Sequence, residues 1–165
     1  MPKFVAGLLL CIASLAAHSV PTNVLNADVT SATQNQTICV SGYTKTVRPS
    51  TSFTHAIKKR LLLTNGLDYE IDKANYELDH IIPLALGGHP RNPQNLVLQA
   101  WEGEVGAKRK DRLEAKLHCL VCNGRLDLEI AQEAIWTDWM SAHINYRAMV
   151  CHRSHKRQLN IRYIE

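Results

Sequence analysis

The sequence has no apolar run near the roughly 20 residues that a membrane-spanning helix needs. It has few aromatic residues, at 6%, and only 8 glycines and 6 prolines among its 165 residues. No segment repeats, and neither sign of charge dominates, because 19 Lys and Arg residues stand against 15 Asp and Glu. These absences exclude stable membrane insertion and a collagen-like chain. The balance of 45% apolar and 21% charged residues is instead typical of a globular protein, for which we expect one small domain and a monomer.

The first 19 residues have the layout of a secretory signal peptide. Lys3 precedes the apolar run Phe4 to Leu15, and the small residues Ala16 to Ser19 follow it. A positive start, a short apolar centre and a small-residue cleavage site predict export. The alternative is a buried N-terminal helix. We therefore expect the protein in the periplasm or outside the cell.

Four cysteines follow the predicted signal peptide. They are Cys39, Cys119, Cys122 and Cys151. An even number of cysteines in an exported chain favours disulfide bonds, and all three pairings stay open. Structural zinc is the alternative, because the C-x-x-C pair and the later Cys-His offer suitable ligands.

Local signals divide the rest of the chain. Residues 20–36 are rich in Thr, Asn, Ser and Ala, which predicts a flexible leader. The apolar pattern from Ile38 to Val47 predicts an extended segment before Pro49. A helix is expected from the cap residues Ser50 to Ser52 as far as Asn65-Gly66.

The second half predicts an α+β fold. The stretch Tyr76 to Gln99 predicts two short strands joined by a long loop, and the prolines and glycines of this loop constrain it. A helix is expected from about Gly106 to Val121, and Asp127 caps another. On the latter we expect these residues to be buried: Ile130, Ala131, Ala134, Ile135 and Trp139. Residues 141–165 hold five Lys or Arg and one Glu, and predict a basic C-terminal tail.

The residues best suited to metal binding and proton transfer are Asp79 and His80. A carboxylate is a hard oxygen ligand for a divalent metal, and an imidazole can take a proton from water near neutral pH. Successive residues of a strand face opposite ways, so both can serve one reaction only if the strand ends there. The alternative is a structural hydrogen-bonded pair.

The sequence around this pair resembles the HNH endonucleases, which share a ββα-metal finger. The similarity lies in the run Asp79 to Leu84, the turn Gly87-Gly88, and Asn95-Leu96, where Asn95 is fifteen residues after His80. Small exported bacterial members are especially similar. They share the segment at Gly42 to Pro49 and the helix at Ala107 to Glu114.

The resemblance covers about residues 37–140 and implies a role for each signature position. His80 is implied as the catalytic general base, and Asn95 as the residue that holds the loop and orients it. Asp79 is implied as a metal ligand. The third signature position, nine residues after Asn95, holds Glu104 in place of the usual His or Asn. Oxygen ligands suit Mg²⁺ or Mn²⁺, which are the expected cofactors.

Several basic residues are candidates for contact with nucleic acid. The predicted contacts, on the segment before the first helix and on the helix after the finger, are Arg48, Lys108, Arg109, Lys110 and Arg112. For Arg48 a structural carboxylate is an equal alternative, and for the others a solvated mixed-charge face. The basic run Lys58 to Arg60 is interpreted as a solvated face, with phosphate contact as its alternative.

The sequence therefore predicts a metal-dependent phosphodiester hydrolase, an HNH nuclease acting on DNA, with RNA as a second candidate substrate. We expect low sequence specificity, because no separate base-reading motif is evident. The main alternative is a non-catalytic nucleic-acid-binding or structural protein that keeps the finger. A secreted toxin with an immunity partner is a third.

Overall fold

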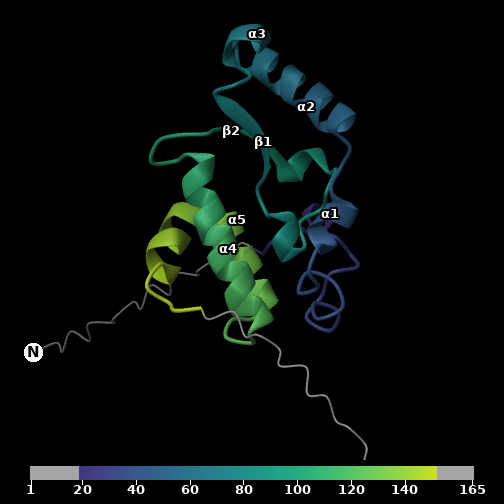
Figure 1. Cartoon of the computed structure of the whole chain (residues 1–165), viewed down its shortest axis with the longest axis vertical. Coiled ribbons are helices and arrows are strands. Elements are labelled where there is room, and N and C mark those ends of the chain that lie inside the picture. The colour runs from purple at the N-terminus through teal and green to yellow at the C-terminus, as the bar shows by residue number, and fades with distance from the viewer. Residues whose placement is uncertain (1–18, 152–165) are drawn as a thin grey trace, which may run out of the picture.

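The computed structural model describes residues 19–151 as a small α+β domain, drawn in Figure 1. Within this range there are five α-helices and one two-stranded sheet: α1 (Tyr43–Val47), α2 (Thr51–Thr64), α3 (Tyr69–Asp72), β1 (Tyr76–His80), β2 (Leu96–Ala100), α4 (Ala107–Cys122) and α5 (Leu128–Tyr146). The predicted α+β class is confirmed. The predicted signal peptide up to His18, and residues 152–165 of the predicted tail, lie outside the described residues.

Strands β1 and β2 form an antiparallel hairpin. Tyr76 pairs with Ala100 and His80 pairs with Leu96. The connecting residues 81–95 contain two short 3-10 turns, Leu84–Leu86 and Pro93–Asn95. The two predicted strands and their constrained loop are therefore confirmed, and His80 is the last residue of β1.

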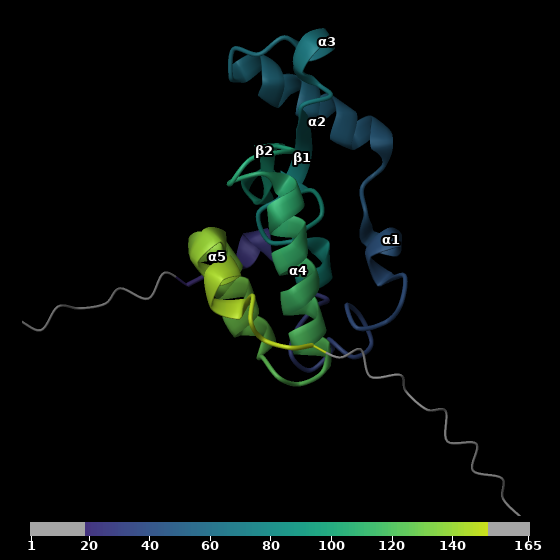
Figure 2. The same ribbon diagram turned by 60° about the vertical axis from the view of Figure 1, so that its left-hand side comes forward.

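Helices α4 and α5 lie side by side and form much of the core, as Figure 2 shows. On α4 the buried residues Leu113, Leu117 and Val121 recur at helical spacing, and Asn123 and Gly124 follow the helix end as predicted. On α5, Ala131 and Ile135 are buried as expected. Ile130 is 47% exposed, so its predicted burial is wrong. One residue turns a helix by about 100°, which carries Ile130 away from the face of Ala131.

Residues 20–36 belong to the folded domain, so the prediction of a flexible leader is wrong. Val24 is 0% exposed and joins the core with Val29. Two backbone hydrogen bonds fasten this segment to the hairpin loop, from Asn26 N to the Gly87 oxygen and from His89 N to the Val24 oxygen. The polar composition of this segment predicted no burial, but Val24 and Val29 are buried by contacts with distant parts of the chain.

The segment before α2 differs from the extended strand that we predicted. Tyr43–Val47 forms the short helix α1 after Gly42. The β-favouring residues that suggested a strand contribute to tertiary packing instead. Ile38 is buried, and Tyr43 packs against the core. The next helix, α2, follows the prediction, with Ser50 as its N-cap and Asn65 as its C-cap.

The predicted boundary between residues 140 and 141 falls inside α5. This helix continues to Tyr146, and Ala142 is buried in the core. The boundary was inferred from charge, but burial of the apolar helix face sets the end of the folded part. No helix within residues 19–151 is both long and apolar enough to cross a membrane.

Two disulfides hold the segment before α1 and the segment after α5 against α4. Cys39 is bonded to Cys122 and Cys119 to Cys151, with Cα atoms 5.4 and 6.1 Å apart. Each cysteine of the C-x-x-C pair belongs to a different bridge, so the disulfide prediction is confirmed over the zinc alternative. Such bonds suit an oxidising environment outside the cytoplasm.

Candidate active site

Asn95 holds the loop that follows His80. Its side chain is 0% exposed. The Asn95 Oδ1 atom accepts a hydrogen bond from Ile82 N at 2.8 Å, and Nδ2 donates to the oxygens of Ile82 and His89 at 3.0 and 3.1 Å. One amide thus joins both ends of the loop, and Asn95 acts by position, without facing a ligand.

The close approach behind this arrangement requires glycine at position 88. A Cβ atom there would lie 1.8 Å from the Ile82 oxygen and 2.7 Å from Asn95 Nδ2. Any larger residue would push the loop off the amide of Asn95. The Gly-Gly turn therefore permits the geometry that fixes the chain beyond His80.

His80 is held in one orientation at the end of β1. The residue is 8% exposed, and its Nε2 atom lies 3.0 Å from the carbonyl oxygen of Pro90. A carbonyl oxygen only accepts hydrogen bonds, so Nε2 carries the hydrogen and Nδ1 of the neutral ring has a free lone pair. No other hydrogen bond of this ring occurs within residues 19–151. The ring can therefore accept a proton at Nδ1.

The surroundings of His80 favour the neutral ring. Burial lowers its pKa below the usual 6.5, and Arg48 and Lys110 act in the same direction. The hydrogen bond to Pro90 and the charge of Asp79 oppose this lowering without reversing it. A base must be unprotonated before it can act, so this environment suits a base at neutral pH.

Asp79 points to α4, where Lys110 meets it. The Lys110 Nζ atom lies 2.7 Å from Asp79 Oδ2, 2.5 Å from Glu114 Oε1 and 2.7 Å from the His80 carbonyl oxygen. The other oxygen of Asp79, Oδ1, accepts a hydrogen bond from the backbone N of His80 at 2.7 Å. Lys110 is 2% exposed and its three donors are satisfied. This buried ammonium therefore ties the last two residues of β1 to the helix.

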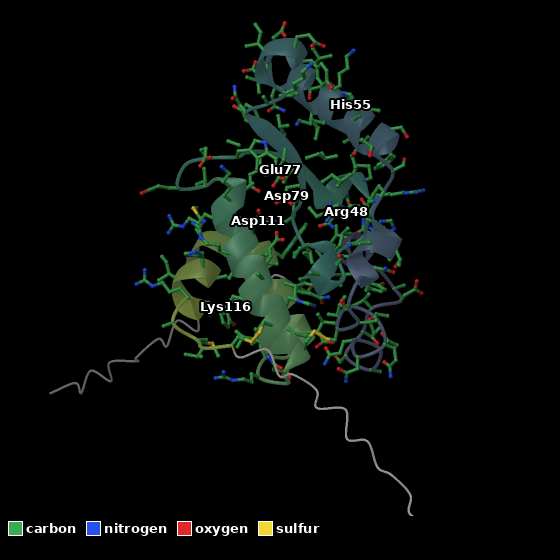
Figure 3. All side chains as sticks on the ribbon, in the orientation of Figure 1. Arg48, His55, Glu77, Asp79, Asp111 and Lys116 are labelled. Carbon is green, nitrogen blue, oxygen red and sulfur yellow. A yellow bond between two sulfur atoms is a disulfide. The ribbon has the colours of Figure 1, made fainter. Side chains whose placement is uncertain are left out.

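Further carboxylates lie around this contact, and Figure 3 shows Glu77, Asp79 and Asp111 close together between β1 and α4. Burial, and then the charges of Asp79 and Asp111, raises the pKa of Glu77 to about 7. Burial also raises the pKa of Glu114 to about 7, against the lowering effect of Lys110. The cluster has more acidic groups than its one ammonium can neutralise.

A cavity of about 430 Å³ lies beside His80, between β1, α2 and α3. Arg48, Lys58 and Lys73 line it, and Glu77 is the one carboxyl group in its lining. Arg48 is exposed and forms no ion pair within residues 19–151. His55 lies at the same cavity and stacks on Tyr69 at 5.3 Å. A neutral imidazole thus borders a cavity in which positive charge predominates.

The two metal ligands predicted from the sequence have different surroundings. Glu104 is exposed on the loop between β2 and α4, while both oxygens of Asp79 are bonded to Lys110 and to backbone. In the described part of the chain, no three His, Cys, Asp or Glu side chains are arranged to hold a metal ion. Asp79 and Glu104 therefore do not fit the expected site, and Lys110 supplies the positive charge at Asp79.

The five predicted nucleic-acid contacts fall into four different environments. Arg48 lines the His80 cavity, and Lys108 forms an exposed ion pair with Glu102. Arg112 lines a cavity with His143 of α5, and Arg109, whose charge also acts on His143, donates to the Glu104 oxygen. The prediction for Lys110 is wrong, because a buried ammonium with three hydrogen bonds cannot reach a phosphate.

Comparisons of this chain with family models, with curated proteins and with solved structures find no match. The arrangement of the site must therefore be interpreted from its own residues.

Three residues of the cavity had no predicted role: Lys73, His55 and Glu77. His55 and Lys73 are distant from His80 in sequence and reach its cavity because α2 and α3 pack near β1, and Glu77 lies on β1 itself. Lys58 lay in a run interpreted as solvated, and its place beside Lys73, whose backbone oxygen accepts from Lys58 Nζ at 2.7 Å, depends on that packing. The spacing of Lys110 and Glu114, four residues apart, was the one local signal for the buried pair.

Proposed function

We propose that this protein hydrolyses phosphodiester bonds in nucleic acid, DNA above all, with His80 as the general base. The observation that carries the proposal is the His80 ring, fixed by Pro90 and bordering a cavity lined with cationic side chains. The predicted resemblance to the HNH endonucleases assigns the same role to His80. The two disulfides are consistent with an exported nuclease.

In the proposed reaction a water molecule in the cavity gives a proton to His80 Nδ1. The resulting hydroxide attacks phosphorus, and the bond from phosphorus to the leaving sugar oxygen breaks. The leaving oxygen keeps that electron pair and takes a proton from solvent water, and His80 returns its own proton to solvent. Positioned general bases of this kind contribute about 10²- to 10⁴-fold to a rate. The carbonyl of Pro90 keeps the ring in the tautomer that this step requires.

The cations of the cavity can stabilise charge on the phosphate. Arg48 has a planar fork of donors that matches phosphate oxygens, and it has no ion-pair partner within residues 19–151. Lys58 adds positive charge on the α2 side, whereas the charge of Lys73 is offset by its exposed ion pair with Glu70. The raised pKa of Glu77 keeps part of its population protonated near neutral pH, which reduces repulsion of an anionic substrate.

A divalent metal stays a prediction from the resemblance. The pair Asp79 and Glu104 does not fit it, so we assign the chemistry of the proposed step to the side chains that line the cavity. The metal requirement is decided by experiment, independently of the role of His80.

The alternative is a non-catalytic nucleic-acid-binding protein that uses the same basic cavity. To separate the two, purified protein with both disulfides formed is incubated with plasmid DNA and, separately, with RNA. Each reaction is run in chelator and then with Mg²⁺, Mn²⁺ or Zn²⁺ restored. The proposal expects nicked or degraded nucleic acid, and loss of this activity in His80→Ala. Binding without cleavage under every condition favours the alternative.

A further inference from the structure

A second cavity, of about 210 Å³, lies between α4 and α5. It is lined by Arg112, Leu113, Lys116, His143 and Arg147, and it shares no residue with the His80 cavity. Figure 3 shows Lys116 well along α4 from the carboxylates Glu77, Asp79 and Asp111. No step of the proposed reaction uses this second cavity.

The cations of the second cavity have no acidic partner in the described chain. None of the four ion pairs within residues 19–151 includes Arg112, Lys116 or Arg147, nor Arg109, which precedes Arg112 on α4 and lies outside the cavity lining. Arg112 Nη1 donates to the Lys108 oxygen at 2.9 Å and Lys116 Nζ to the Met149 oxygen at 2.5 Å, which positions both side chains without neutralising them. Asp111 interacts electrostatically with Arg112 but forms no ion pair with it. The charge of this cavity thus lacks an anion.

His143, which lines the same cavity, adds a polar atom without a partner. Its Nδ1 atom is buried and has no hydrogen-bond partner. A buried polar atom without a partner loses free energy that a ligand atom can restore. Burial is the largest cause that lowers the pKa of His143, and the charges of Arg109, Arg112 and Arg147 lower it further. In the neutral ring, an N–H at Nδ1 can donate to an anionic oxygen.

We propose that this cavity binds a phosphate of a nucleic-acid backbone, at a second site outside the cavity of His80. The volume of about 210 Å³ is several times the roughly 30 Å³ that a water molecule occupies in the liquid, so a phosphate group has room. The inference rests on the proposed function, because it concerns how the same substrate is held.

The arrangement of the cations favours a linear polyanion over a small one. Arg109, Arg112 and Lys116 occupy positions i, i+3 and i+7 of α4 and so form one stripe along the helix. At 1.5 Å per residue this stripe is about 10 Å long. Successive phosphates of one DNA strand advance about 3.4 Å along the duplex axis, so the stripe spans more than one of them. Contacts of this type position a nucleic acid without reading its sequence.

The test measures binding of a fluorescein-labelled DNA duplex by His80→Ala protein, which leaves the duplex intact. In this background the double variant Arg112→Gln with Arg147→Gln is compared with Lys45→Gln with Arg60→Gln. Lys45 and Arg60 are exposed and form no ion pair within residues 19–151, so both variants remove two positive charges from the surface. We expect the first variant to bind about tenfold or more weakly, with a plot of log K against log salt concentration flatter by about 1 to 2. The control is expected to change affinity by less than about threefold.

Arg112→Lys with Arg147→Lys keeps the charge and is expected to bind nearly as His80→Ala protein does, which excludes misfolding as the cause of a loss. Equal affinities for the two glutamine variants, or no binding of duplex by the His80→Ala protein, would overturn the second site.

A second arm titrates inorganic phosphate and follows the ring signals of His143 by NMR. The signals are expected to move with phosphate, and added duplex is expected to compete. Movement with phosphate that duplex does not reverse would assign the cavity to a free anion and overturn the nucleic-acid inference. Failure here is distinct from failure of the proposed function: His80-dependent cleavage, with duplex binding indifferent to Arg112 and Arg147, removes only the second site.

Discussion

Asp79 and His80 are neighbours in the chain, but their side chains contact different parts of the molecule. Asp79 meets Lys110 on α4, and His80 borders the cavity beside α2 and α3. Their opposite directions follow from the alternation of side chains along a strand. Asp79 therefore helps to position His80, because Lys110 binds both the Asp79 carboxylate and the His80 carbonyl oxygen.

Replacement of Lys110 by Met should destabilise the protein strongly at pH 8. Two carboxylates would then be buried without their counter-charge, and breaking a buried ion pair in this way costs about 3–5 kcal/mol. Lys110 lowers the pKa of Glu114, so its loss raises that pKa further above the unfolded value of 4.5. The loss should be largest above the folded pKa of Glu114 and shrink as pH falls below about 7, where Glu114 is protonated in the folded protein with or without Lys110.

Urea unfolding of Lys110→Met at pH 8 and pH 5 measures this difference. The matched control is Lys108→Met, which removes an exposed ammonium two residues away and should leave the unfolding midpoint almost unchanged. Equal destabilisation by the two variants would contradict the structural role of Lys110.

At the scale of elements, local signals predicted α2, α4 and the hairpin well. Ser50 caps α2, and Asn123 with Gly124 ends α4, because capping is decided by a few neighbouring residues. Residues 20–36 were mispredicted because the burial of Val24 depends on the distant hairpin loop.

The candidate site shows the same division between local and distant contacts. The bonds of Asn95 agree with its predicted place in the loop, because the Gly-Gly turn and the two strands fix the loop from nearby. Glu104 was selected by its spacing alone, but the loop between β2 and α4 leaves it exposed. Lys110 contacts Asp79 because of the way α4 crosses the end of β1, which spacing cannot reveal.

The packing of β1 on α4 predicts that the protein is more stable in mild acid than at pH 8. The pKa of Glu77 and that of Glu114 are both raised from 4.5 to about 7, so the folded state binds more protons than the unfolded state between these values. The stability that these two carboxyl groups contribute must then fall as pH rises through that window, while His80 and His143, whose pKa values are lowered, act in the opposite direction only below 6.5. Because Glu77 is only half-buried, solvent screens much of its effect, and we expect a melting temperature higher by about 3 °C at pH 5.5 than at pH 8.

Thermal melting in chelator at the two pH values tests this expectation. Glu77→Gln should reduce the difference, whereas Glu70→Gln, which alters an exposed carboxylate on α3, should preserve it. A protein that melts at a higher temperature at pH 8 would refute the assignment of raised pKa values to this cluster.

At the scale of the whole molecule, two distant segments of the chain are fastened near the C-terminal end of α4. Cys39 precedes α1 and Cys151 follows α5, and their partners are Cys122 and Cys119. The proposed site lies by the other end of this helix, where Lys110 meets β1. The disulfides therefore stabilise the domain without entering the chemistry.

Removing the Cys39–Cys122 bridge should destabilise the protein more than removing Cys119–Cys151. The bridges span 83 and 32 residues, and chain entropy then gives upper values of about 4–5 and about 3–4 kcal/mol. Urea unfolding of the two double Cys→Ser variants measures the order, with the intact protein as reference. A larger loss for the shorter loop would show that native contacts outweigh loop entropy here.

The central claim is that His80 takes the proton from water, and its most direct test is chemical rescue. Single-turnover cleavage of a labelled DNA duplex is measured for the intact protein and for His80→Gly, with and without imidazole in solution. We predict that His80→Gly cleaves at least about 10²-fold more slowly and that imidazole restores part of the rate by taking the vacant place of the ring. Cleavage by His80→Gly at the rate of the intact protein would contradict the account.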